Sequence, residues 1–319
     1  MVSGSTMIDV RRLHRYYGAT RAVDDISFEV QRGQVFGYIG PNGAGKTTSM
    51  RVLATMDIPT RGDAYIDGFS VINDPDRVRR RLGYMPDAYG AYPNVNCEDY
   101  LDFFARAYGL MGAERRRAVR RVIDFTRMKP LLDKPMQGLS KGMKQRLCLG
   151  RALIHDPSVL ILDEPAAGLD PRARIELREM IGKLAADGKT ILISSHILTE
   201  LAEMCHVVGI VEKGRLLATG SVEEIRHHHA DPHEPPATEL RVRVLARAAE
   251  LARWLEERHD IDQALVEVDL VRFPYFQDQS AQAVLLREIL RAGFDVVEYG
   301  MRTSSLEDVF LRVTRGEVQ

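Results

Sequence analysis

The sequence predicts an α/β fold for residues 1–226, a linker over residues 227–238 and a small α+β domain over residues 239–319. Two patterns indicate the α/β part. Short β-branched runs alternate with helical stretches, and four of these runs are almost uniformly apolar, as parallel strands covered on both faces are. A third observation is a glycine-rich loop that joins one such strand directly to a helical stretch.

The expected strands of the first domain are the β-branched runs Ile26 to Val30, Val35 to Ile39, Val159 to Leu162, Lys189 to Ile193 and Val207 to Val211. Two helices are expected to begin at an aspartate followed by a proline, Asp74-Pro75 and Asp170-Pro171. An aspartate side chain caps the free N–H groups of a helix start, and proline suits the first helical position.

A helical subdomain is predicted over about residues 88–156, because the strand signal disappears there and helical segments appear at about 97–108 and 113–126. Arginines crowd on the second segment, and either a solvated helix face or a docking surface accounts for them. They are Arg115, Arg116, Arg117, Arg120 and Arg121.

The boundary between the domains is placed at His227 to Pro236. A polar linker is the plainer interpretation of this stretch, since its histidines show no regular metal-ligand spacing, although metal binding with His233 is the alternative. Beyond it, strands are expected at 240–244, 265–273 and 295–299, and helices at 248–258, 281–292 and 305–313. This β-α-β-α-β order predicts a small ferredoxin-like domain.

Charge and apolar content narrow the classes of function. Lys plus Arg number 44 and Asp plus Glu 45, and from Asp231 onward 17 acidic residues outnumber 11 basic ones. A general nucleic-acid binder needs a basic surface, so no nucleic-acid partner is expected. No segment resembles a secretory signal or reaches the roughly 20 apolar residues of a membrane-spanning helix. We therefore expect a cytoplasmic protein that reaches a membrane only through a partner.

The strand Val35 to Ile39 runs into a loop that matches GxxxxGK[ST] in full, Gly40-Pro41-Asn42-Gly43-Ala44-Gly45-Lys46-Thr47-Thr48. Its glycines let successive N–H groups point at phosphate oxygens, and the following helix adds its positive N-terminal end. Lys46 supplies a charge to the β- and γ-phosphates, and Thr47 places its hydroxyl on Mg²⁺. The loop therefore predicts a nucleotide phosphate site.

Two further strands end in residues suited to hydrolysis. Val159 to Leu162 is followed by Asp163, which can hold a metal-bound water beside the phosphates, and by Glu164, the candidate general base for the attacking water. His196 comes just after the strand Lys189 to Ile193, where it can donate to a γ-phosphate.

In this order the motifs resemble the ATP-binding cassette (ABC) ATPases over residues 7–225, with Ala167-Gly168-Leu169-Asp170 and Leu139 to Arg146 as further matches. The resemblance implies that the chain binds ATP, that Tyr17 stacks on adenine and that Asp170 communicates across a dimer. It also implies that a signature contacts the γ-phosphate of the opposing subunit, formed by Ser140, Lys141, Gly142 and Met143. The plainer alternatives are a packed strand-end aromatic for Tyr17 and helix capping for Asp170.

A contact from the opposing subunit also has a physical argument. Ser140 and Gly142 open a helix, which makes a second anion-binding helix end, and one nucleotide does not need two such ends from one chain. A two-fold dimer places each phosphate loop opposite the partner's signature. The expected partner is a second copy of the chain or a related ATPase.

Two positions depart from the family pattern. The usual LSGGQ signature reads Leu139-Ser140-Lys141-Gly142-Met143, so a Gly and the Gln are replaced. Asp87 stands where family members usually carry the Gln that contacts Mg²⁺ and the attacking water. An aspartate still binds a cation there, so Asp87 keeps a metal and catalytic assignment, with a shorter reach.

The segment Ser305 to Leu311 resembles the end of ATPases that serve type-2 ABC exporters, which pair with separate membrane-spanning permeases. The favoured function is therefore an ATP-hydrolysing transport motor, peripheral on the cytoplasmic face of the membrane. The alternative is a non-transport ABC ATPase of DNA repair or translation, which usually carries a coiled-coil insertion, a zinc module or a second cassette. A small-molecule kinase leaves Ser140 to Arg146 and His196 unexplained.

Overall fold

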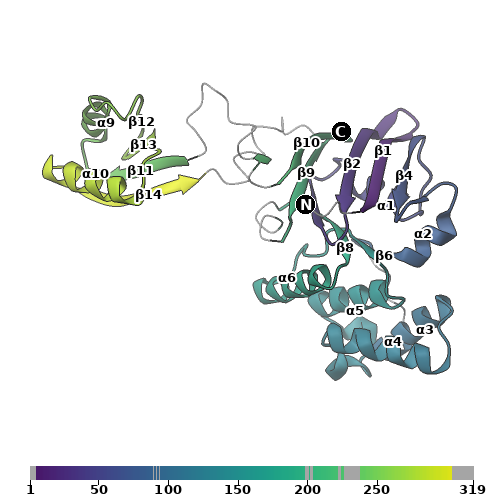
Figure 1. Ribbon diagram of the computed structural model, residues 1–319. Coiled ribbons are helices and arrows are strands. Elements are labelled where there is room, and N and C mark those ends of the chain that lie inside the picture. The colour runs from purple at the N-terminus through teal and green to yellow at the C-terminus, as the bar shows by residue number, and fades with distance from the viewer. Residues whose placement is uncertain are drawn as a thin grey trace. The chain divides into compact units, whose positions relative to one another are not determined.

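The computed structural model describes residues 5–88, 90, 92, 94–197, 201, 204–221, 224–225 and 238–303. The chain divides into two compact units between Val222 and Glu223, and Figure 1 labels the elements of both. The predicted closing helix at 305–313 and the histidine-rich stretch from His227 lie outside the described residues. Among the described residues, no helix is long and apolar enough to span a membrane.

The first unit contains a six-stranded sheet with strand order β10-β9-β3-β8-β7-β6. Its strands are β3 (Val35–Ile39), β6 (Leu82–Met85), β7 (Val159–Leu162), β8 (Thr190–Ser195), β9 (Val207–Glu212) and β10 (Arg215–Gly220). All neighbouring pairs are parallel except β9 with β10. Every residue of β3, β7 and β8 is buried, which confirms the predicted parallel strands covered on both faces.

A second, antiparallel sheet of the first unit has the order β2-β1-β4-β5. Its strands are β1 (Thr6–Tyr17), β2 (Thr20–Gln31), β4 (Arg61–Ile66) and β5 (Phe69–Ser70). Helix α1 (Lys46–Leu53) contributes Met50 and Leu53 to one apolar cluster that also takes in Leu13 and Phe36 from the two sheets. This shared core fixes the helix that comes after the phosphate loop.

The other α-helices with described bounds in the first unit are α2 (Pro75–Arg81), α3 (Cys97–Ala107), α4 (Gly112–Phe125), α5 (Lys141–Leu153) and α6 (Pro171–Ala186). Figure 1 shows α3 and α4 grouped beside α5, and both predicted helical segments are present. Asp170 caps α6 by accepting a hydrogen bond from the Ala173 N–H at 2.9 Å, as predicted. The predicted cap at Asp74 is wrong, because its side chain makes no capping hydrogen bond to α2.

Over residues 238–303 the second unit forms an antiparallel sheet with the order β12-β13-β11-β14 and two helices. Its elements are β11 (Thr238–Val244), α9 (Ala248–Glu256), β12 (Leu265–Glu267), β13 (Leu270–Pro274), α10 (Gln279–Arg291) and β14 (Val296–Thr303). The single strand expected at 265–273 is wrong: it is a hairpin that turns at Val268, whose φ is 56°. A β-branched residue rarely adopts this conformation, so residue type carries no turn signal at this position.

Candidate functional site

The site lies where three parallel strands end side by side. Strand β3 pairs with β8, and β8 pairs with β7, so their carboxyl ends meet at one edge of the sheet. The loop from Gly40, the pair Asp163 and Glu164, and His196 come directly after these three strand ends. The sheet thus brings together the loop, the carboxylate pair and the histidine that the sequence singled out.

Two glycines shape the phosphate loop. A Cβ on Gly40 would lie 2.2 Å from the Val211 carbonyl oxygen, and one on Gly45 would lie 2.2 Å from the Ala22 carbonyl oxygen. Gly45 also has a φ of 96°, in the region that favours glycine. The loop is therefore pressed against β2 and β9, and Ala44 is held by a hydrogen bond from the Gly214 N–H at 3.0 Å.

The loop leads into α1 as predicted, with Lys46 at the first helical position. Asn42, Gly43 and Thr47 are exposed, Pro41, Gly45 and Thr48 are half-buried, and Lys46 is buried. The Lys46 Nζ donates to the carbonyl oxygens of Gly40 at 2.6 Å and Pro41 at 3.1 Å. Its charge is therefore folded over the loop, where phosphate oxygens would replace the two carbonyl oxygens as acceptors.

Glu164 is held in an unusual backbone conformation. Its φ of 48° lies in the left-handed region, and such strain is typical of functional positions. The Oε2 atom lies 2.8 Å from His196 Nδ1, and Oε1 forms an ion pair with Lys46 Nζ at 3.3 Å. Oε1 accepts no aligned hydrogen bond from any described residue although it is buried. The charge of this carboxylate oxygen is balanced by Lys46, and no described residue directs a hydrogen bond at it.

Asp163 is fully buried between β7 and β8. Its Oδ1 accepts a hydrogen bond from Ser194 at 2.7 Å, whereas its Oδ2 has no partner among the described residues. Burial raises the pKa of Asp163, the nearby charges of Glu164 and Asp87 raise it further, and the Ser194 and Thr47 hydroxyls act in the opposite direction. A buried oxygen without a partner, a threonine hydroxyl and a second carboxylate form an all-oxygen set that fits a hard divalent cation.

Ser194 is a site residue to which sequence reasoning gave no role. It is fully buried in β8, and its hydroxyl accepts from the Glu164 N–H at 2.9 Å while donating to Asp163. One side chain therefore fixes both members of the carboxylate pair. The sequence did contain a signal for it. Ser194 is a polar residue directly after an apolar strand, and the strand beside it in the sheet is followed by the two carboxylates.

Tyr17 ends β1 and is 45% exposed. Its hydroxyl donates to Asp57 Oδ2, and the guanidinium of Arg15 lies 4.3 Å from the centre of its ring. Asp57 comes after the end of α1 and was not singled out by the sequence. Tyr17 therefore stands at a strand end, but its ring is held by two side chains rather than packed in the core, as the plainer alternative would have it.

The signature residues lie at another surface of the first unit. Ser140 caps α5 by accepting from the Met143 N–H at 3.3 Å. Gly142 and Asp170 line a cavity of about 330 Å³ with Met143 and Arg146, and its lining includes no residue of the 40–48 loop. Lys141 extends toward Gly168, since a Cβ there would lie 2.6 Å from the Lys141 Nζ. The two helix starts, α5 and α6, thus share one hollow apart from the phosphate loop.

A glycine-shaped loop, a carboxylate pair and a histidine at neighbouring strand ends define a P-loop ATPase. A family model described as ABC transporter matches residues 23–167, and relatives match the chain over almost its whole length. The chain belongs to this ABC transporter family, as an ATP-binding protein with ATPase activity. The interpretation of the motifs as those of an ABC ATPase is confirmed.

The relatives include ATP-binding proteins of transport systems. The chain is 36% identical to the Nod factor export ATP-binding protein I of Ralstonia nicotianae, over 99% of this chain and 96% of the relative. It is 34% identical to the probable multidrug ABC transporter ATP-binding protein YbhF of Escherichia coli, over 74% of this chain and 40% of the relative. The similarity to the first relative therefore extends through the second unit.

Solved structures show the same fold for the first unit. An ATP-binding subunit of an ABC transporter is 34% identical, with a TM-score of 0.64 over 69% of this chain and 92% of that one. A dimeric ATP-binding cassette bound to ADP and Pi is 21% identical, with a TM-score of 0.63 over 68% of this chain and 99% of that one. Cassettes of this fold dimerise.

Proposed function

We propose that the chain is the ATP-hydrolysing subunit of an exporter and drives a separate membrane permease by ATP-dependent closure of a head-to-tail dimer. The observation that carries the proposal is the separation of the two anion-binding surfaces: the signature hollow shares no residue with the phosphate loop. A bound nucleotide needs a phosphate loop and a signature, so the signature comes from a second chain. Similarity to Nod factor export proteins over nearly the whole chain supports the export direction.

Each site residue has an assigned part in hydrolysis. The amides of Gly40 to Thr48 cradle the phosphates, and Lys46 exchanges its two carbonyl acceptors for phosphate oxygens. Mg²⁺, when bound, neutralises charge on the β- and γ-phosphates; Thr47, Asp163 and Asp87 would hold it, partly through water. Tyr17 stacks on the adenine.

Glu164 takes the proton from the attacking water through Oε1, the carboxylate oxygen that pairs with Lys46 and to which no described residue donates a hydrogen bond. His196, which holds the other carboxylate oxygen at 2.8 Å, keeps Glu164 in place and donates to the γ-phosphate through its second ring nitrogen. Ser140, Lys141, Gly142 and Met143 of the partner chain close the site, and Asp170 lies beside them. The partner is a second copy or a related ATPase.

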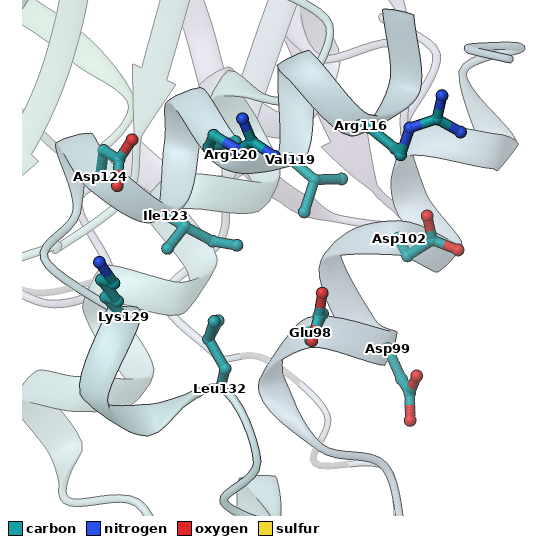
Figure 2. Close-up of a pocket in the computed structure, with 10 residues that line it drawn as sticks. All are labelled: Glu98, Asp99, Asp102, Arg116, Val119, Arg120, Ile123, Asp124, Lys129 and Leu132. Carbon is teal, nitrogen blue, oxygen red and sulfur yellow. The ribbon is translucent and has the colours of Figure 1, made fainter. Parts of the chain in front are cut away.

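Two hollows, one where the helical subdomain meets β6 and one within it, are suited to contact with a permease. A cavity of about 230 Å³ lies beside β6, which leads to Asp87, and is lined by Tyr84 and Tyr108. A second hollow, of about 570 Å³, lies between α3 and α4, and Figure 2 shows Asp102 and Arg116 among its lining residues. Movement at Asp87 would pass to the permease through the surface that contains these two hollows. Bound to the permease in this way, the chain is peripheral on the cytoplasmic face of the membrane.

The arginines of α4 divide into some that pair with acidic side chains and some that line the larger hollow. Arg115 pairs with Asp102 at 2.8 Å and Arg121 with Asp156 at 3.5 Å, whereas Arg116 and Arg120 line the larger hollow. The docking interpretation is therefore proposed for Arg116 and Arg120 alone.

The second unit is assigned to the ferredoxin-like class. Its β-α-β-β-α-β order and its sheet order β12-β13-β11-β14, antiparallel throughout, support this assignment.

A Glu164→Gln variant tests the catalytic assignment. It is expected to bind ATP with wild-type affinity and to lose about 100-fold or more of its turnover, because the glutamine cannot accept the proton. Glu179→Gln, which removes an exposed carboxylate on α6, is the matched control and should keep wild-type turnover. Unimpaired turnover of Glu164→Gln would remove Glu164 as the base. Co-purification of a permease with the chain tests the transport assignment.

A further inference from the structure

The ring of Tyr17 is fixed before any nucleotide arrives. Arg15 reaches the carboxylate of Asp57 with two nitrogens, its Nε at 3.1 Å and a terminal nitrogen at 2.8 Å. The Tyr17 hydroxyl donates to the same carboxylate, so one acid holds both the hydroxyl and the guanidinium. Such a two-pronged contact restricts the arginine to one plane.

This arrangement leaves one side of the tyrosine available. The Arg15 guanidinium lies over one face of the ring at 4.3 Å, as in a cation–π contact, and Tyr17 is nevertheless 45% exposed. The Arg15 and Asp57 side chains are only 23% and 15% exposed. The largely buried side chains of Arg15 and Asp57 thus support one face of the Tyr17 ring, and the other face is open to a planar ligand.

Asp57 lies in the segment that links α1 with β1. It comes after α1, the helix that starts at the phosphate loop, and its Oδ1 accepts from the Ile58 N–H at 2.9 Å. The same loop is joined to β1, since Thr60 Oγ1 accepts from the Tyr16 N–H at 2.9 Å. Burial alone would raise the pKa of Asp57, but hydrogen bonds from Tyr17 and Arg15 lower it, so the carboxylate stays charged.

We infer that Arg15 and Asp57 are positioning residues for the nucleobase: they lock Tyr17 in a stacking orientation at a fixed offset from the phosphate loop. This inference rests on the proposed function, in which Tyr17 stacks on adenine. An exposed tyrosine that rotates freely loses rotamer freedom when a base stacks on it, and a clamped one has lost it already. Arg15 and Asp57, which together we call the clamp, therefore raise the affinity for ATP without contacting it.

Three substitutions test the clamp in the full-length chain, with affinities for ATP and for inorganic tripolyphosphate measured by titration calorimetry. Asp57→Asn and Tyr17→Phe each weaken ATP binding by up to about tenfold, because binding must again supply the ordering of one side chain. Neither changes the affinity for tripolyphosphate, which has no base. In a Tyr17→Ala background, Asp57→Asn adds no further loss.

Tyr65→Phe is the matched control, because Arg11 lies 4.6 Å from the Tyr65 ring in a similar stack on the neighbouring strand. It is expected to leave both affinities unchanged. The inference is overturned if Asp57→Asn keeps ATP affinity within about twofold of wild type, or if it weakens ATP and tripolyphosphate equally. If Tyr17→Ala itself binds ATP normally, the adenine assignment fails instead, and a Lys46→Ala chain that binds normally removes the phosphate site.

Discussion

Ser194 offers a quantitative test of how the carboxylate pair is held. Replacing it by alanine removes the acceptor of the Glu164 N–H and the donor to Asp163, both of which are buried. A buried neutral group left without a partner costs about 1–3 kcal/mol, and a charged one costs more. We therefore expect Ser194→Ala to lower the free energy of unfolding of the first unit by about 3–4 kcal/mol.

The neighbouring serine is the control. Among the described residues, Ser195 accepts one hydrogen bond, from the Ile197 N–H at 2.9 Å, so Ser195→Ala is expected to cost about 1 kcal/mol. Urea unfolding is followed by far-UV circular dichroism without nucleotide. The single tryptophan, Trp254, lies in α9 of the second unit, so its fluorescence transition should not move. A loss for Ser194→Ala no larger than that for Ser195→Ala would show that Ser194 does not hold the pair.

Two other substitutions have definite outcomes. Gly40→Ala should abolish ATP binding in a filter assay, because its Cβ would lie 2.2 Å from a backbone oxygen. Gly182→Ala in α6 is the control and should bind ATP normally, because nothing lies within 4 Å of a Cβ there. Normal ATP binding by Gly40→Ala would contradict the loop geometry. Burial lowers the pKa of His155 from 6.5 to about 4, so the unfolded chain binds the proton more tightly and stability falls as pH drops from 6.5 toward 4. Urea unfolding at pH 6.5 and pH 4 measures this decrease in the free energy of unfolding. His155→Gln should make the decrease smaller by up to roughly 3 kcal/mol. A decrease as large as that of the wild type would show that His155 is not held neutral in the folded chain.

The positions of the motifs could be predicted because strands buried on both faces leave a strong sequence signal. Val159 to Leu162 and Val35 to Ile39 are apolar or glycine throughout, and the residues directly after each strand are polar or glycine-rich. The partners of the site residues could not be predicted in this way. Asp57 and Ser194 come from segments far from Tyr17 and Asp163 in sequence, and only the sheet pairing and the end of α1 bring them together.

The same limit explains the errors. The hairpin at Val268 lacks the glycine or asparagine that marks a turn, so its two short strands were indistinguishable from one. At Asp74 the sequence allowed a cap, but the side chain makes no hydrogen bond to the first turn of α2. Asp170, in the same aspartate–proline pattern, does cap its helix. Local pattern alone does not separate these two cases.

The proposed motor depends on ATP binding to the loop from Gly40 to Thr48 and on a second chain that completes the pocket. Both are tested together by the molar mass of Glu164→Gln in light scattering, with and without MgATP, beside a Glu164→Gln, Lys46→Ala double variant. We expect MgATP to double the mass of the single variant and to leave the double variant monomeric. A Glu164→Gln chain that binds ATP and stays monomeric, or a double variant that dimerises equally, would contradict this mechanism.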